Sequence, residues 1–180
     1  QVSGWCGVGS RQRTRMAEWI ALDRLLVDPQ PQRSIGVCDG EVIDHSRFRQ
    51  RVLAWRAAFA AADGRDWALY FDDAVAFAAA LFGAWHAGKR VFLAADNLPA
   101  TLQALQPQVS GFAGDVSADY RALVAPTVGV DGELQVLDER ACELCVFTSG
   151  STGQPSAINK RMDQLAREVD ALQAAFGAQL

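Results

Sequence analysis

Short apolar runs alternate with longer, Ala-rich amphipathic segments over most of the chain, and this alternation constrains the fold more than any other feature. Short apolar runs predict strands, and apolar residues at three- and four-residue spacing predict helices. We expect strands over 35–38, 42–44, 67–71, 90–93, 109–112, 133–137, 144–148 and 157–160, and helices over 17–26, 46–62, 72–87, 98–105 and 162–176. Strands that alternate with helices are joined by right-handed crossovers. The predicted fold is α/β, a mainly parallel sheet flanked by helices.

Polar residues between these segments predict how the elements begin and end. Ser46 is placed to cap the helix over 46–62, and Gly40 completes an Asp-Gly hairpin turn. The carboxylates that follow strands or open helices are interpreted as caps and turns rather than as metal ligands: Asp72, Asp73, Asp96 and Asp115.

The composition excludes several classes of protein. The 180 residues are 50% hydrophobic and 21% charged, an ordinary globular mixture that suffices for one compact domain or lobe. The formal net charge of −4 argues against a surface for nucleic acid or anionic membrane. No apolar run is long enough to span a bilayer, and nothing resembles a secretory signal. We therefore expect a cytoplasmic protein.

The four cysteines show no spacing of a disulfide framework: Cys6, Cys38, Cys142 and Cys145. The last two are three residues apart, but a zinc site needs further ligands, and both histidines are distant in sequence. A strand through Cys145 places Cys142 near its start on the opposite face. We predict that both are structural residues.

The loop over 148–155 carries the strongest functional signal. Residues 147–156 are Phe-Thr-Ser-Gly-Ser-Thr-Gly-Gln-Pro-Ser, directly after an apolar strand. The hydroxyls and glycines of such a loop can direct hydroxyl and backbone N–H donors at an anion. Open α/β sheets place ligands where a strand ends in a loop. No lysine follows Gly153, so this is not a Walker loop. The sequence predicts a phosphate-binding loop, with a solvated linker as the alternative.

The order Thr-Ser-Gly-Ser-Thr-Gly-x-Pro over 148–155 resembles the phosphate loop of the adenylate-forming superfamily. That superfamily includes acyl-CoA and aryl-CoA synthetases and the adenylation domains of peptide synthetases. The preceding hairpin, long helix and His-Ala-Gly-Lys-Arg-Val segment over 86–91 are also similar to its N-terminal part. The resemblance covers about residues 17–175, with its specific part in the loop. It implies an N-terminal α/β subdomain of an AMP-forming acid–thiol ligase.

The resemblance also implies roles for individual residues. The phosphates of ATP, with Mg²⁺ sharing their charge, would be bound by Thr148, Ser149, Gly150, Ser151, Thr152 and Gly153. The implied enzyme joins a small-molecule carboxylate to ATP as an acyl-adenylate. It then transfers the acyl group to the thiol of coenzyme A or of an acyl carrier protein. No catalytic residue and no metal ligand of the family falls within this sequence.

The sequence departs from the family pattern in two respects. Ser156 stands where lysine usually follows the loop proline. Lys160 lies four residues further on; it either reaches back to phosphate or is a solvated residue before the last helix. The family's later adenine-binding segment and C-terminal catalytic lysine are absent. We therefore expect residues 16–180 to be a truncated subdomain, inactive without the missing C-terminal part of its chain.

Three further expectations complete the sequence-based prediction. Residues 1–15 lack apolar periodicity and begin with Gln1, so we expect a disordered or non-native leader. A non-catalytic adenylation-like binding or scaffold domain is one alternative function. An unrelated α/β nucleotide-binding protein with a chance loop is another.

Overall fold

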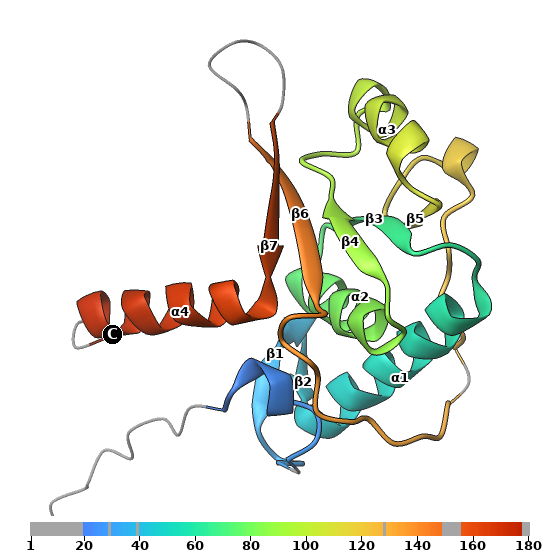
Figure 1. The fold of residues 1–180 in the computed structure, drawn as a ribbon. Coiled ribbons are helices and arrows are strands. Elements are labelled where there is room, and N and C mark those ends of the chain that lie inside the picture. The colour runs from blue at the N-terminus through green and yellow to red at the C-terminus, as the bar shows by residue number, and fades with distance from the viewer. Residues whose placement is uncertain (1–19, 29, 39, 128, 149–155, 178–180) are drawn as a thin grey trace, which may run out of the picture.

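The computed structural model describes residues 20–28, 30–38, 40–127, 129–148 and 156–177, which form a five-stranded sheet with helices on both faces (Figure 1). The strand order is β5-β3-β4-β6-β7. The strands are β3 (Asp66–Tyr70), β4 (Arg90–Leu93), β5 (Gly111–Gly114), β6 (Glu143–Thr148) and β7 (Ser156–Arg161). The pairs β3–β4, β3–β5 and β4–β6 are parallel, and β6–β7 is antiparallel. The predicted mainly parallel α/β fold is confirmed.

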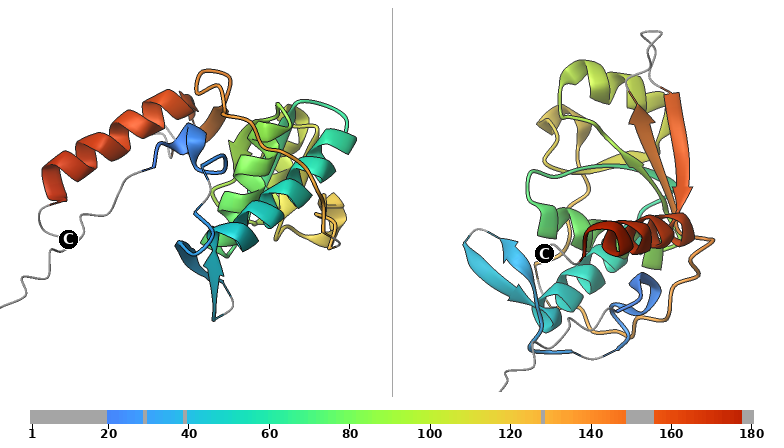
Figure 2. Two further views of the ribbon diagram at one scale, coloured as in Figure 1. Left: turned by 90° about the horizontal axis from the view of Figure 1, so that it is seen from below. Right: turned by 90° about the vertical axis from the view of Figure 1, so that its left-hand side faces the viewer.

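Residue alternation along the strands divides the core into two faces. Trp67 and Leu69 of β3 pack with the apolar sides of α1 (His45–Ala61) and α2 (Ala74–His86). Ala68, between them, packs on the opposite face with Leu102 and Leu105 of α3 (Pro99–Leu105). The two helical layers are visible in Figure 2. Successive strand side chains point to opposite faces, so a strand segment buried on both sides is apolar throughout, as residues 67–69 of β3 are.

The N-terminal elements correct two predictions. Strands β1 (Ser34–Cys38) and β2 (Glu41–Asp44) form the predicted hairpin. The cap of α1 is Asp44, whose Oδ1 accepts a hydrogen bond from the backbone N of Arg47 at 2.8 Å; Ser46 is already inside the helix, so its prediction as the cap was wrong. Asp73 caps α2 in the same way, accepting from Ala76 N at 2.7 Å.

The helix predicted over 17–26 is also wrong in its described part. There the chain forms only a 3₁₀ turn, η1 (Leu22–Arg24), preceded by an extended Ala21. Nε2 of the buried His45 lies 2.7 Å from the carbonyl oxygen of Leu25, which it hydrogen-bonds. That tertiary bond occupies a carbonyl that a continuing helix would have used.

No strand forms over 133–137, contrary to prediction. Arg56 of α1 donates to the carbonyl of Glu133, and Arg49 donates to the carbonyl of Gly132 at 3.0 Å. Leu134, within this segment, has a buried side chain. Arginine side chains thus satisfy backbone groups that would otherwise need a neighbouring strand.

The remaining boundaries differ slightly from prediction. The strand predicted over 109–112 is β5 (Gly111–Gly114), because pairing with β3 sets its register at Trp67 and Gly111. Two short 3₁₀ helices flank it, η2 (Gln106–Gln108) and η3 (Ala118–Tyr120). The last helix, α4 (Met162–Phe176), is confirmed. No helix in the described ranges is long and apolar enough to cross a bilayer.

The two neighbouring free cysteines, Cys142 and Cys145, lie on opposite faces of the sheet, as predicted. Cys142 belongs to the α1–α2 side of the core and Cys145 to the α3 side. Burial raises the pKa of the Cys142 thiol to about 12 and also raises the pKa of Cys145. Buried thiols with raised pKa values are unreactive, which supports structural roles. Over the described part of the chain, no group of His, Cys, Asp and Glu could hold a metal ion.

We predict that His86 makes the fold less stable in acid. Its Nε2 is buried without a partner among the described residues. Desolvation, and secondarily the charge of Arg56, lowers its pKa from 6.5 to about 4. The unfolded chain then binds a proton that the folded chain does not, so stability falls as pH decreases from 6.5 through 4. Partial exposure limits this effect to on the order of 1 kcal/mol.

Urea denaturation at several pH values between 4 and 7 measures this effect. We expect His86→Gln to flatten the pH dependence of the free energy of unfolding relative to the unmodified chain. An unchanged slope in the variant would show that other groups cause the acid sensitivity.

Candidate functional site

The carboxyl ends of four parallel strands meet at one edge of the sheet, which we call the carboxyl edge. It is formed where β3 ends at Tyr70, β4 at Leu93, β5 at Gly114 and β6 at Thr148. In Figure 1 this edge is uppermost. Ligands of open α/β sheets bind outside this end of the strands. The edge is therefore the first place to search for a site.

The connections define a switch point within this edge. After β3 the chain enters α2 on one face, whereas after the adjacent β4 it enters α3 on the other. Where neighbouring strands send their connections to opposite faces, a crevice opens between their ends. An open cavity of about 290 Å³ lies there, lined by Tyr70, Phe71, Asp72, Ala74, Phe77, Leu93 and Ala94.

Carboxylates fix the turns around this crevice. Tyr70 Oη donates to Asp72 Oδ1 at 3.0 Å, and the backbone N of Asp72 donates to Asp115 Oδ2 at 2.9 Å. Asp96 Oδ1 accepts from the backbone N of Leu98 at 3.1 Å. The hydrogen bond to Asp72, and then its charge, raise the pKa of Tyr70. These contacts confirm the interpretation of the aspartates as cap and turn residues.

A glycine holds two strand ends close together at this edge. Gly114 has φ of 101°, and a Cβ on it would collide with the carbonyl oxygen of Tyr70. Only glycine adopts this conformation without strain and permits this approach. The sequence at the end of β5 is therefore dictated by its proximity to the end of β3.

The predicted phosphate loop is attached at the same edge. Its first residue, Thr148, ends β6, and Ser156 begins β7 opposite it in register. The other predicted loop residues lie outside the described part of the chain: Ser149, Gly150, Ser151, Thr152 and Gly153. The β6–β7 pairing thus holds the two ends of the loop together. Strand β6 is the neighbour of β4, whose end lines the crevice.

Lys160 lies at the other end of that hairpin. It pairs in register with Leu144, four residues from Ser156. Four strand residues span about 13 Å, leading away from the carboxyl edge. Its Nζ bonds both carboxylate oxygens of Glu168 in α4, at 2.7 and 2.8 Å. This placement gives Lys160 a partner on the last helix, and its role toward phosphate stays a prediction.

Solved structures share this arrangement, although no family model and no curated protein matches the chain. The N-terminal subdomain of Klebsiella oxytoca NpsA in complex with 3-hydroxyanthranilyl-AMSN matches with a TM-score of 0.60 and 17% identity, over 79% of this chain and 40% of that one. O-succinylbenzoate coenzyme A synthetase (MenE) from Bacillus subtilis, in complex with AMP, matches with a TM-score of 0.64 and 16% identity, over 88% of this chain and 46% of that one. The AMPPNP-bound form of the nonribosomal peptide synthetase FmoA3 has a TM-score of 0.64 and 14% identity, over 82% of this chain and 17% of that one.

This is the fold of the N-terminal part of adenylate-forming enzymes. The chain spans less than half the length of each of these structures. Within the adenylate-forming fold, the described residues supply the sheet, its carboxyl edge and both attachment points of the loop.

The crevice residues of this fold were not predicted from the sequence. Tyr70, Phe71 and Leu93 follow or end their strands, a signal that was available. That β3 and β4 are neighbours with oppositely directed connections is a property of strand order, which no local pattern encodes.

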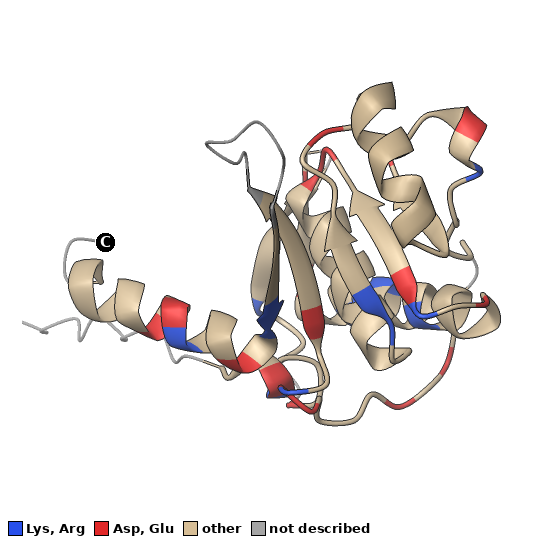
Figure 3. Cartoon of the chain, turned by 45° about the horizontal axis from the view of Figure 1, so that its top comes forward, with Lys and Arg blue, Asp and Glu red and all other residues tan. Residues whose placement is uncertain are grey.

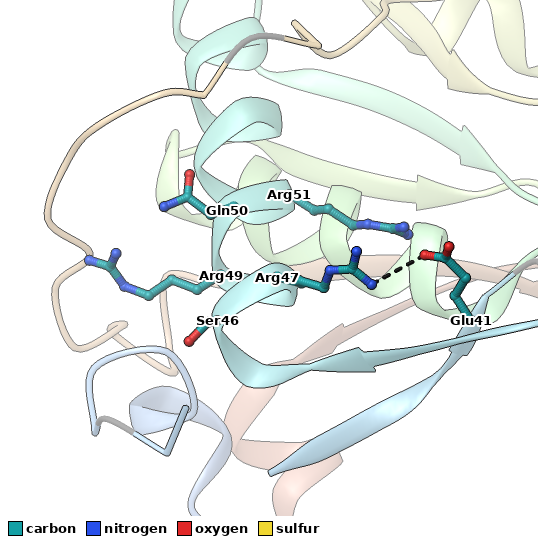
Figure 4. A pocket seen from close by; sticks show the side chains of 6 residues that line it. All are labelled: Glu41, Ser46, Arg47, Arg49, Gln50 and Arg51. Carbon is teal, nitrogen blue, oxygen red and sulfur yellow. Dashed lines mark hydrogen bonds and ion pairs between the residues drawn. The ribbon is translucent and has the colours of Figure 1, made fainter. Parts of the chain in front are cut away.

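A second cavity, near the start of α1, is not a convergent site. It is about 450 Å³ and open, and is lined by Glu41, Ser46, Arg47, Arg49, Gln50 and Arg51. Figure 4 shows Arg47 directed toward Glu41, whereas Arg49 points away from them. Arg47 pairs with Glu41 at 3.2 Å, Arg49 bonds the carbonyl of Gly132, and Arg51 contacts Cys38 Sγ at 3.2 Å. Because each arginine has its own partner, the group is structural.

Proposed function

We propose that the chain is the N-terminal part of an ATP-dependent acyl- or aryl-CoA synthetase, in which residues 148–153 bind the phosphates of ATP. One observation carries the proposal. The Thr-Ser-Gly-Ser-Thr-Gly-x-Pro segment leaves the sheet at the carboxyl end of β6, in a chain with the fold of adenylate-forming enzymes. The fold likeness also disfavours an unrelated protein with a chance loop.

The proposed reaction is attack of a carboxylate oxygen on the α-phosphorus of ATP, with pyrophosphate as the leaving group. Its rate depends on holding the polyanion in line and stabilising the charge that develops on it. The hydroxyls of Thr148, Ser149, Ser151 and Thr152, with backbone N–H groups at Gly150 and Gly153, supply donors for the β- and γ-phosphates. The thiol of coenzyme A or an acyl carrier protein then attacks the carbonyl carbon of the acyl-adenylate, which forms a thioester and releases AMP.

Mg²⁺ fits this proposal as an ion carried by the nucleotide. Mg²⁺ usually keeps several waters and binds through substrate phosphates with one or two carboxylates. The described residues offer no ligand cluster of their own. The charge that Mg²⁺ neutralises is thus on ATP, while this chain's loop orients the phosphates.

The substrate we propose is an aryl or acyl carboxylate. Two of the similar structures are named for or bound to aryl groups, o-succinylbenzoate and 3-hydroxyanthranilyl. We place the reaction in the cytoplasm, where the buried thiols of Cys142 and Cys145 stay reduced.

ATP–pyrophosphate exchange by the complete gene product, with a panel of aryl, fatty and amino acids, tests the proposal. We expect exchange with one acid class in the complete product and none with the 180-residue chain alone, because the chain spans less than half of the similar structures. Exchange catalysed by the 180-residue chain would contradict the predicted inactivity of this part.

A non-catalytic adenylation-like domain is the second candidate. Ser156 in place of the usual lysine favours it, because a cation next to the phosphates is missing there. A folded gene product that exchanges with no acid would select this candidate, and Ser156→Lys is then the first substitution to restore activity.

A further inference from the structure

A row of alternating charges crosses the sheet at the end opposite the carboxyl edge. Asp66 begins β3, Arg90 begins β4 and Glu143 begins β6, and the pairing of these strands sets the three residues side by side. Arg161, the last residue of β7, is the register partner of Glu143. Figure 3 shows acidic and basic positions alternating across these four strands. Register partners point to the same face of a sheet, so each charge lies beside charges of opposite sign.

Arg90 is the centre of this row. Its Nε and Nη2 donate to the two carboxylate oxygens of Asp66 at 2.7 and 2.9 Å, and its Nη1 lies 3.9 Å from Glu143 Oε2. The side chains of Arg90, Asp66 and Glu143 are only 30%, 26% and 30% exposed. An isolated surface ion pair contributes little to stability, whereas a bidentate pair within a partly shielded network contributes more. The row therefore ties β3, β4 and β6 together.

The apolar residues of β4 and β6 do not by themselves determine how these two strands align. Residues 144–147 are apolar at four successive positions, and they lie beside the apolar residues 91–93 of β4. Because both faces of the sheet are covered, a shift of β6 by one residue would exchange one buried apolar side chain for another. The same shift toward Val91 would turn the Glu143 carboxylate to the α1–α2 side of the core, away from Arg90. Burying an unpaired carboxylate is costly, so the charges select the observed alignment.

The alignment of β6 decides where Thr148 lies at the carboxyl edge. Glu143 and Thr148 are the first and last residues of this strand. A strand rises about 3.3 Å per residue, so a shift of one residue would move Thr148 by that length relative to the end of β4. Misplacement of a reacting group by about 1 Å can reduce the rate of an enzyme about 100-fold.

We propose that Arg90 is a positioning residue for the phosphates of ATP. By pairing with Asp66 and Glu143 at one end of the sheet, it fixes the alignment of β6 and so the place of Thr148 at the other end. Arg90 lies away from the proposed phosphate contacts, so it acts only through the strands. This inference rests on the proposed function, because it takes the segment that follows β6 as the phosphate loop.

ATP–pyrophosphate exchange by the complete gene product, with ATP and the carboxylic acid varied in turn, tests this role. Arg90→Met removes the charge and keeps a long side chain. We expect its KM for ATP to rise about fivefold or more and its KM for the acid to stay within about twofold, because only the phosphate site moves. Partial unfolding would instead lower the apparent turnover and leave both KM values unchanged.

Arg47→Met is the matched control. It also breaks an ion pair, the contact of Arg47 with Glu41 at 3.2 Å, but outside the five-stranded sheet. Both of its KM values should equal those of the unmodified product. A KM for ATP in Arg90→Met equal to that of Arg47→Met, or an equal rise in both KM values of Arg90→Met, would overturn the proposal.

Arg90→Lys and hydrogen exchange keep the test decisive if Arg90→Met does not fold. Lysine keeps the positive charge but cannot form two parallel bonds to Asp66, so its KM for ATP should rise by a smaller factor. The amides of residues 144–147 should exchange about tenfold faster in the Arg90 variants than in Arg47→Met, because β6 is less firmly held. An unmodified product that exchanges pyrophosphate with no acid would overturn the proposed function instead. Equal amide exchange in all variants would show that Arg90 does not hold β6.

Discussion

Replacing Gly153 by alanine, or Thr152 by valine, should reduce ATP–pyrophosphate exchange by the complete gene product about 100-fold or more. Valine keeps the shape of threonine and removes one hydroxyl donor. Alanine adds a methyl group where backbone must approach a phosphate closely. Both changes act on the developing charge of the leaving group, so turnover rather than acid affinity should fall.

Asn159→Ala is the matched control for these loop variants. Asn159 is an exposed residue of β7, beyond the loop but on the same hairpin. Its exchange rate should stay within about twofold of the unmodified protein, since it lies outside the proposed phosphate contacts. Circular dichroism should be the same for all three variants. Near-normal exchange in both loop variants would remove the assignment of residues 148–153 as the phosphate loop.

Features set by local sequence were predicted well. The middle residues of the strands around Trp67, Val91 and Cys145 are apolar because both faces of the sheet are covered by helices. The period of α4 was an equally local signal. The two faces of the Cys142–Cys145 pair followed from strand alternation alone.

Features set by tertiary contacts were not predicted. Residues 133–137 have the alternation of a strand, but the guanidinium groups of Arg49 and Arg56 hold the backbone instead. Ser46 is a good cap residue, yet Asp44 two positions earlier is where the chain leaves β2. The first outcome depends on residues that are distant in sequence, and the second on where the preceding strand ends.

The candidate site divides in the same way. Its loop is contiguous in sequence and was found from residue order. Its crevice joins the ends of β3 and β4, so it required strand order. Lys160 shows that short separation in sequence does not imply proximity in space. It is close to the loop in sequence, but it lies four residues along an extended strand from Ser156, away from the carboxyl edge.

Replacing Gly83 by valine should destabilise the fold by about 3 kcal/mol, the upper range for overpacking a core. Gly83 is buried where α2 crosses α1. A Cβ there would collide with Cβ of Trp55 and lie 2.9 Å from the backbone N of Arg56. Neither atom is the end of a flexible side chain, so the two helices must separate. Separation of the helices would also disturb the packing of Trp55 and Phe59 of α1, whose ring centroids lie 5.6 Å apart.

Ala60→Val separates this collision from the intrinsic cost of valine in a helix. Ala60 is exposed on α1, so its substitution carries the propensity term of about 0.5 kcal/mol without crowding. Urea denaturation followed by tryptophan fluorescence gives both free energies, because Trp67 and Trp85 are buried in the same core. Equal losses in the two variants would mean that α1 and α2 do not approach at Gly83. A much larger loss at Gly83 would show that α1 and α2 can approach closely only because residue 83 has no side chain. These two helices also support β3 and its carboxyl end.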